Sequence, residues 1–137
     1  MKRFAAALIL SSSLAVSADE PPARHLIYLH GRIVQEQQSA RPKHPEFGYY
    51  ELDRIVETFE KRGFPVTAGI RPMAATLDES AAKVVDQVRA LLASGVPASR
   101  IAVVGGSMGA AIALRASLRQ QNPAVSFSVL GACMSQS

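Results

Sequence analysis

The segment Gly105–Gly109 (GGSMG) is the part of the sequence whose residue types and spacing best suit covalent chemistry. It places Ser107 between a predicted buried strand at 100–104 and a predicted helix at 110–121. Glycines at both flanks relieve the crowding of a sharp strand-to-helix turn and leave the serine oxygen exposed. The first N–H groups of the helix point to the same place, so the N–H of Met108 is placed to donate to an oxyanion. The pattern predicts a nucleophilic serine.

Spacing excludes two other uses of the same glycines. A dinucleotide-binding fingerprint that began at Gly105 would need glycine at 107 and 110, where the chain has serine and alanine. A phosphate-binding loop needs a Gly-Lys-Ser/Thr run, and no lysine follows Lys83. A tight turn that carries an incidental serine remains an open alternative to the nucleophile.

Strand-like and helix-like segments alternate along the chain, and this alternation predicts how the motif is positioned. The expected strands span 25–30, 64–70, 100–104 and 125–130, and the expected helices span 50–62, 76–95 and 110–121. The middle helix begins with a Thr76–Glu79 capping box. The stretch 31–48, which holds two prolines, is expected to be a loop. Strands separated by helices form a parallel sheet with helices on both faces, a three-layer α/β fold.

With these features the sequence resembles the α/β-hydrolase family, and in particular its serine esterases and lipases. The resemblance is carried by VVGGSMGAA around Ser107, by the His30-Gly31 pair that ends the first strand, and by the alternation of elements. It implies hydrolysis of an ester or related acyl substrate through an acyl-enzyme on Ser107, without a metal or cofactor. It also implies that the backbone N–H groups of Met108 and Arg32 form the oxyanion hole. The supporting residues would be His30, Gly31, Gly105, Gly106 and Gly109.

The sequence departs from this family in the acid and the base of the catalytic triad. Family members place an Asp or Glu and then a His after the serine, but residues 108–137 contain none of the three. The expected sheet has about four strands, where the family usually continues with two more. The chain therefore resembles the N-terminal part of a hydrolase, incomplete at its C-terminus. The alternative is a non-catalytic truncated remnant or a binding module of the same fold.

Three histidines are candidates for the missing base. His30 belongs to the oxyanion loop and is expected to order that loop, and His25 starts its strand at the far end of the sheet. His44 lies in the loop at the same edge as Ser107. Two roles stay open for His44, that of a general base and that of a solvated loop residue.

Basic residues gather in the loops that an α/β sheet brings to the edge where ligands bind. They are Arg32, Arg41, Lys43 and Arg71, set against Glu36 and Glu46. They indicate either a preference for an anionic substrate or, more commonly for such a pattern, ordinary solvated loop charge. The single cysteine, Cys133, excludes a disulfide within the chain, and it has no charged neighbour in sequence that would activate it as a nucleophile.

Residues 1–18 have the layout of a secretory signal peptide, with a basic start, a short apolar run and small residues at a cleavage site. The mature domain is then expected at 19–137, periplasmic or secreted, and the apolar run is too short for stable membrane insertion. Without Lys2 and Arg3, the 15 basic residues fall to 13, against 11 acidic ones. No basic run remains, so nucleic acid is not an expected partner. The uncharged last strand, Val125–Leu130, predicts self-association through a sheet edge.

Overall fold

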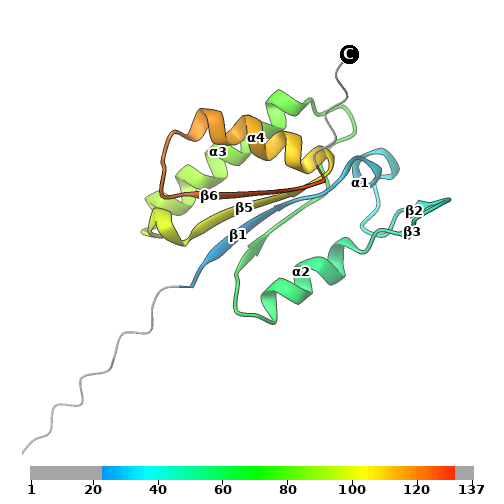
Figure 1. Cartoon of the computed structure of the whole chain (residues 1–137), viewed down its shortest axis with the longest axis horizontal. Helices are drawn as coiled ribbons and strands as arrows, with labels where there is room; N and C mark the ends of the chain where they lie inside the picture. Colours follow the sequence, from blue (N-terminus) through cyan, green and yellow to red (C-terminus); the bar gives the residue numbers. More distant parts are fainter. Residues whose placement is uncertain (1–22, 132–137) are drawn as a thin grey trace, which may run out of the picture.

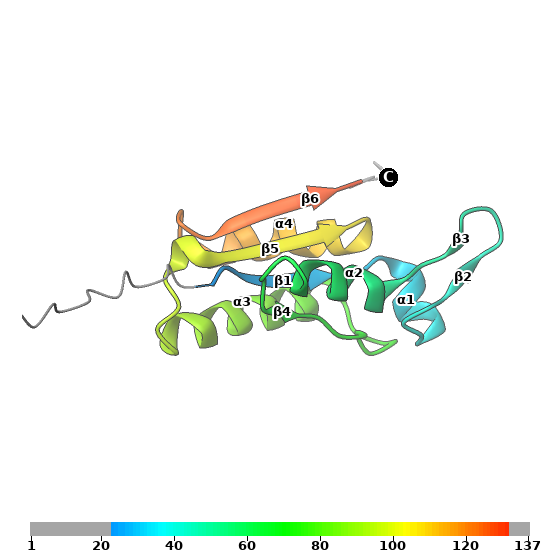
Figure 2. The same cartoon turned by 90° about the horizontal axis from the view of Figure 1, so that it is seen from below.

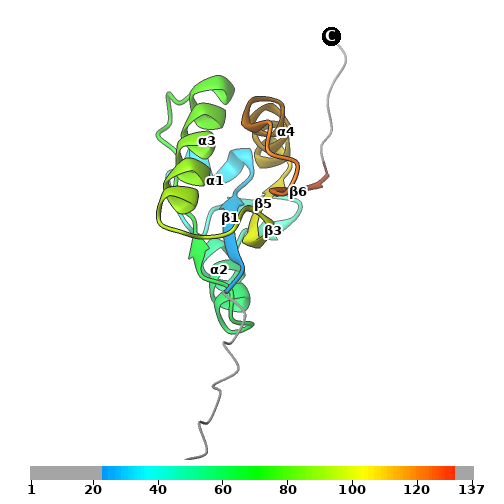
Figure 3. The ribbon, with the colours of Figure 1, turned by 90° about the vertical axis from the view of Figure 1, so that its left-hand side faces the viewer.

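A computed structural model describes residues 23–131, and four parallel strands form its main sheet (Figure 1). The strands are β1 (His25–Leu29), β4 (Val66–Thr67), β5 (Ile101–Gly106) and β6 (Ser126–Leu130), in the spatial order β4-β1-β5-β6. Helix α2 (Leu52–Glu60) covers one face of the sheet, and helices α3 (Leu77–Ala93) and α4 (Met108–Gln120) cover the other (Figure 3). The predicted three-layer α/β fold is confirmed.

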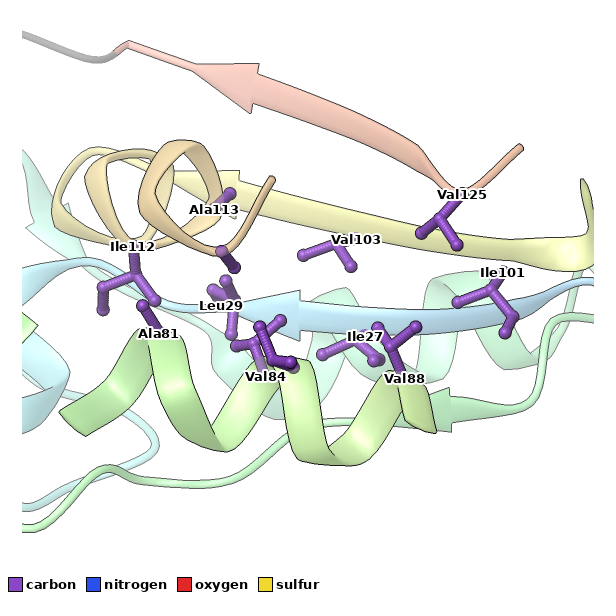
Figure 4. Packing of buried hydrophobic residues seen from close by; sticks show 12 residues of the cluster. Ile27, Leu29, Ala81, Val84, Val88, Ile101, Val103, Ile112, Ala113 and Val125 are labelled. Carbon is purple, nitrogen blue, oxygen red and sulfur yellow. The ribbon is translucent and has the colours of Figure 1, made fainter. Parts of the chain in front are cut away.

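The larger part of the core lies between the sheet and the two helices α3 and α4 (Figure 4). The strand residues that point into this layer are every second residue of β1 and β5, as a pleated sheet requires: Ile27, Leu29, Ile101 and Val103. A smaller cluster around Tyr28 fills the opposite face under α2. Fully burying one branched apolar side chain stabilises a fold by about 1.5–3 kcal/mol, so these layers hold the strands in place.

The pairing of β1 with β5 places the two motifs of the sequence side by side. In this parallel pair Leu29 faces Gly105. The residues that come next, His30-Gly31 after β1 and Gly106-Ser107 after Gly105, therefore emerge next to each other at the carboxyl edge of the sheet. In open α/β sheets this is the edge at which ligands bind.

The prediction of a loop over residues 31–48 is wrong. This stretch contains a short helix, α1 (Arg32–Gln37), and an antiparallel hairpin of β2 (Lys43–His44) with β3 (Gly48–Tyr49). The hairpin projects beyond the carboxyl edge of the main sheet (Figures 1 and 2).

Side-chain contacts across the hairpin explain why hydropathy patterns do not predict it. The Arg41 guanidinium lies 3.9 Å from the centre of the Tyr49 ring, a cation–π arrangement. The rings of His44 and Phe47 stack with their centres 4.7 Å apart. Such pairs form between residues that lack any regular apolar spacing, so a search for periodicity does not register them.

Strand β4 is shorter than the predicted strand over 64–70. It pairs with β1 over two residues only, Val66 and Thr67. Beyond Thr67 the chain leaves β1, and the backbone N–H of Arg71 donates to Nε2 of His30 at 3.1 Å. The His30 side chain, just after β1, thus accepts a backbone N–H that would otherwise seek a partner in a strand. The ladder between β1 and β4 therefore ends after Thr67.

The three predicted helices are present with shifted ends. Helix α2 begins at Leu52 rather than at 50, and α4 begins at Met108 rather than at 110. The capping box of α3 is confirmed, because the Thr76 hydroxyl accepts from the Glu79 N–H at 3.1 Å. In return the Glu79 carboxylate accepts from the Thr76 N–H at 2.8 Å. The two bonds satisfy N–H groups that the start of a helix otherwise leaves free.

Strand β6 forms one edge of the sheet within the described part of the chain. It carries no charge, and Leu130 is 59% exposed. Among residues 23–131, no helix has both the length and the apolar character that crossing a membrane demands. The predicted signal peptide (1–18) and Cys133 lie outside the described residues.

Candidate active site

Ser107 occupies the turn between β5 and α4 in a strained backbone conformation. Its φ of 53° and ψ of −116° lie outside the regions that a residue with a side chain normally adopts. Such a conformation costs about 1–3 kcal/mol and persists where the surroundings fix it, often at functional sites. Here the Ser107 N–H donates to the Leu130 carbonyl at 2.8 Å, which anchors the turn to the end of β6. The residue itself is exposed at the carboxyl edge.

Two of the three glycines around Ser107 are required by close packing. A Cβ on Gly105 would lie 2.1 Å from the Gly109 carbonyl oxygen, and a Cβ on Gly109 would lie 2.0 Å from the Leu29 carbonyl oxygen. Gly106 is different, because the atom nearest to a Cβ built there would be the Tyr28 hydroxyl oxygen, at 3.8 Å. The first and last glycines of the motif therefore let α4 approach β5 and β1 closely, which no other residue would allow.

The start of α4 and the end of β1 both meet Ser107. The Ser107 carbonyl accepts from the Ala110 N–H at 2.9 Å, and the N–H groups before this one have no partner within the helix. Met108 carries one of them. On the other side, a Cβ built on Gly31 would lie 3.7 Å from the Ser107 Cβ, so the Gly31 position faces the serine. The next N–H along the chain belongs to Arg32. The roles of Met108 and Arg32 as oxyanion donors stay predictions.

His30 is buried directly behind Gly31, with 1% of its surface exposed. Its Nδ1 lies 2.8 Å from the Gly31 carbonyl oxygen, and its Nε2 accepts the backbone N–H of Arg71 at 3.1 Å. A carbonyl can only accept, so Nδ1 carries the hydrogen and the imidazole is neutral. Burial is the main cause that holds the pKa of His30 below its usual value, and the nearby charge of Arg71 adds to it. Both ring nitrogens are engaged, so His30 holds the loop and is not free to take a proton from Ser107.

The lowered pKa of His30 predicts that the fold loses stability in mild acid. The unfolded chain takes up a proton as the pH falls through the ordinary imidazole pKa of 6.5, while the folded protein resists it. Each further unit of pH then costs up to about 1.4 kcal/mol of unfolding free energy, until the folded state protonates as well. Urea unfolding of the wild type and of His30→Asn between about pH 5 and 8 measures this. The asparagine amide can still donate to the Gly31 carbonyl but does not titrate. If the free energy of unfolding falls equally with pH in the wild type and in His30→Asn, the expectation is wrong.

The other two histidines are no better placed as a base. His25 is the first residue of β1, at the opposite end of the strand from Gly31. His44 accepts the backbone N–H groups of Glu46 and Phe47 at its Nδ1, at 3.1 and 3.2 Å. A proton on that nitrogen would break both bonds of the hairpin turn. The structure therefore favours a structural role for His44, which ends strand β2 of the hairpin rather than lying in a loop as expected.

A hydrogen-bonded pair of tyrosines lies behind the site and was not predicted from the sequence. The hydroxyl oxygens of Tyr28 and Tyr50 are 2.7 Å apart, and the Tyr50 ring lies 3.9 Å from the Cβ position of Gly31. Burial first, and then the hydrogen bond to Tyr50, raise the pKa of Tyr28 far above its usual value. The Tyr28 hydroxyl therefore stays protonated at neutral pH. In the sequence Tyr28 is one residue of an apolar strand, which gives no sign of a polar contact.

The basic residues at this edge do not form one group. Arg32, Arg41 and Lys43 are exposed, as solvated charge would be, and Arg41 pairs with Glu51 at 2.9 Å. Arg71 is the exception, because only 9% of its surface is exposed and burial lowers its pKa to about 10. Its assignment to solvated loop charge is wrong. Because charged side chains are almost never buried, sequence reasoning had no basis for expecting this.

Two cavities flank the site. One of about 530 Å³ opens between β1, β4 and α3, and the residues that line it include Arg71 and Lys83 but not Ser107. A smaller one of about 270 Å³ lies under the hairpin and is bordered by Tyr50, which also contacts the Gly31 position. Within residues 23–131 no three side chains of His, Cys, Asp or Glu are grouped so that they could hold a metal ion.

A family comparison agrees with this geometry. Residues 59–137, more than half of the chain, match the family model described as phospholipase/carboxylesterase. The chain belongs to the phospholipase/carboxylesterase family. This is a family of the α/β-hydrolase type, whose members are hydrolases of small molecules, and the predicted resemblance is confirmed. The match includes the serine motif but begins after His30-Gly31. No curated protein and no solved structure matches the chain.

Proposed function

We propose that the protein is a serine hydrolase that cleaves an ester or related acyl bond through an acyl-enzyme on Ser107. The observation that carries the proposal is the conformation of Ser107 itself. The serine is held in a strained turn and exposed, with close-packed glycines behind it and Gly31 beside it. Strain that the surrounding packing fixes is characteristic of a nucleophile elbow and serves no purpose in an ordinary connecting turn.

The chemistry follows from the groups around the serine. The Ser107 oxygen attacks the acyl carbon, a carbon–oxygen bond forms, and the carbonyl electron pair moves to the oxygen. That oxyanion accepts hydrogen bonds from the Met108 and Arg32 N–H groups. When it collapses, the alcohol leaves with its bonding pair and takes up a proton. Water later attacks the ester on Ser107, the bond from the acyl carbon to the serine oxygen breaks, the acid is released, and the serine oxygen takes back a proton. The serine proton must pass to a base, and no Asp, Glu or His follows Ser107 in this sequence.

One observation favours a second candidate function, a non-catalytic module that keeps the binding edge of the fold. The imidazoles of His30 and His44 are both engaged in hydrogen bonds, so neither is free to act as the base. In this alternative the elbow is intact, but the serine hydroxyl has nothing to activate it.

Labelling with a fluorophosphonate probe distinguishes the two functions. The purified chain is compared with Ser107→Ala and with Ser99→Ala, which removes an exposed hydroxyl at the opposite end of β5. A reactive elbow labels the wild type and Ser99→Ala equally and leaves Ser107→Ala unlabelled. Folded wild type that takes up no probe, or Ser107→Ala that labels like the wild type, would rule out the acyl-enzyme and favour the binding module.

Two further parts of the proposal rest on the sequence. The first is export, with residues 1–18 removed as a signal peptide, and N-terminal sequencing of the protein from its natural source tests it. The second is self-association through the uncharged strand β6, which lies at an edge of the described sheet. Sedimentation velocity at increasing protein concentration tests that part.

A further inference from the structure

Arg71 is a buried cation without an anionic partner in the described part of the chain. Its Nε donates to Oε1 of Gln35 at 3.0 Å, and its Nη2 donates to the carbonyls of His30 and Gly31 at 2.8 and 3.4 Å. All these acceptors are neutral, and the remaining nitrogen, Nη1, is buried without a hydrogen bond. Burying an uncompensated charge is costly. The contacts of Arg71 therefore suggest a role beyond packing.

The contacts of Arg71 act on one peptide unit beside Ser107. The Gly31 carbonyl is held by Nδ1 of His30 at 2.8 Å and by the guanidinium of Arg71. In a planar trans peptide the N–H points opposite to the carbonyl. The N–H of that same unit belongs to Arg32 and is therefore turned away from the guanidinium. The Gly31 position faces Ser107, since a Cβ built there would lie 3.7 Å from the Ser107 Cβ. An oxyanion on the serine adduct would form on this side of the loop, away from Arg71.

Gln35 and Gln38 keep the guanidinium from moving. The Gln35 amide donates to the carbonyls of three residues that follow Arg71: Pro72, Met73 and Ala75, at 3.0, 3.2 and 3.0 Å. The Gln38 amide donates to the carbonyl of Arg71 itself at 2.9 Å. Helix α1 and the segment after β4 are thereby joined around the arginine. A group fixed in this way needs no rearrangement when charge develops nearby, which is what makes electrostatic stabilisation effective.

We propose that Arg71 is a positioning residue of the oxyanion site, which fixes the Gly31–Arg32 peptide with its N–H toward Ser107 and adds a fixed positive charge behind it. The inference rests on the proposed function and deepens it. It implies that the site favours tetrahedral anionic adducts of the serine over neutral ligands of the same shape. The arginine does not touch the substrate in this proposal, since it is buried behind the loop.

The kinetic test separates binding of a fluorophosphonate from its reaction. In the reaction the Ser107 oxygen bonds to phosphorus, fluoride leaves with the electron pair of its bond, and the serine proton passes to solvent. Rates over a series of probe concentrations give an initial binding constant and a first-order rate constant. Arg71→Met is expected to lower the rate constant by about 10²-fold with little change in binding, and Arg71→Lys to fall between it and the wild type. The control is Arg89→Met, which replaces an exposed arginine on α3 that pairs with Asp86 at 3.3 Å.

An equal rate constant in Arg71→Met and the wild type would overturn the proposal, as would a loss confined to the binding constant. A nuclear Overhauser effect between the Arg32 amide proton and the Ser107 side chain gives a readout that needs no reactivity. This Overhauser effect is expected in the wild type and in Arg89→Met. It should be weaker in Arg71→Lys and absent in Arg71→Met. If Arg71→Met does not fold, Arg71→Lys tests the proposal in its place. A rate constant and an Overhauser effect equal to those of the wild type would then refute the positioning role. A wild type that shows the effect but takes up no probe would refute the acyl-enzyme and leave the role of Arg71 intact.

Discussion

Gly109→Ala is expected to leave the chain unfolded or to lower its free energy of unfolding by more than about 4 kcal/mol. Helix propensity alone predicts that the substitution would raise the free energy of unfolding, because alanine is favoured over glycine inside a helix by about 1 kcal/mol. At this position the steric clash outweighs the gain in helix propensity. The new Cβ would lie 2.0 Å from the Leu29 carbonyl oxygen, and that oxygen belongs to the central strand β1 and cannot move aside.

Gly106→Ala is the matched control, three residues away on the same turn. Its Cβ would meet nothing closer than 3.8 Å, and its φ is not in the left-handed region, so its stability should be unchanged or raised by up to about 1 kcal/mol. Urea unfolding followed by circular dichroism measures both variants. Equal stability of the two would mean that α4 does not pack against the end of β1, and the described position of Ser107 would then be wrong.

Those elements that depend on local pattern were predictable from the sequence. The apolar runs of β1 and β5 and the Thr76–Glu79 capping box each use neighbours in the chain, and the structure contains all of them. The serine motif is local in the same sense, because strand, turn and helix follow one another without interruption. That Gly31 lies beside Ser107 could be expected only through the family resemblance, since it depends on the register of two strands far apart in sequence.

Features that depend on contacts between distant polar residues were not predictable. Helix α1 is only six residues long, and its buried Gln35 bonds to carbonyls that lie 37 to 40 positions further along the chain. Arg71 is buried by contacts with His30 that span 41 positions. In the sequence both look like ordinary surface residues, because glutamine and arginine are usually exposed. The same contacts shorten β4, so the error in that strand and the missed burial of Arg71 have one cause.

An activated ester such as p-nitrophenyl acetate is expected to give a burst of about one equivalent of nitrophenolate per 137-residue chain, followed by turnover that is slower by about 10²–10⁴-fold than in an enzyme with a general base. In the first step the Ser107 oxygen bonds to the acetyl carbon, the serine proton passes to solvent water, and nitrophenolate leaves without needing an acid. The oxyanion site can therefore support this step in the absence of a general base. The second step needs a base to activate water, and the sequence after Ser107 supplies none. Absorbance at early times and intact mass measure the burst and the acetyl group that remains bound.

Hydroxylamine tests whether the acetyl group is held as an ester on Ser107, because it is a strong nucleophile that attacks an ester without a general base. Its addition should release the acetyl group from the wild type and restore a second burst, whereas Ser107→Ala should show no burst at all and Ser99→Ala should behave like the wild type. Steady turnover with no bound acetyl group would mean instead that a base reaches Ser107. His44 would then be the first residue to replace, since the exposed hairpin that carries it projects at the same edge of the sheet as the serine.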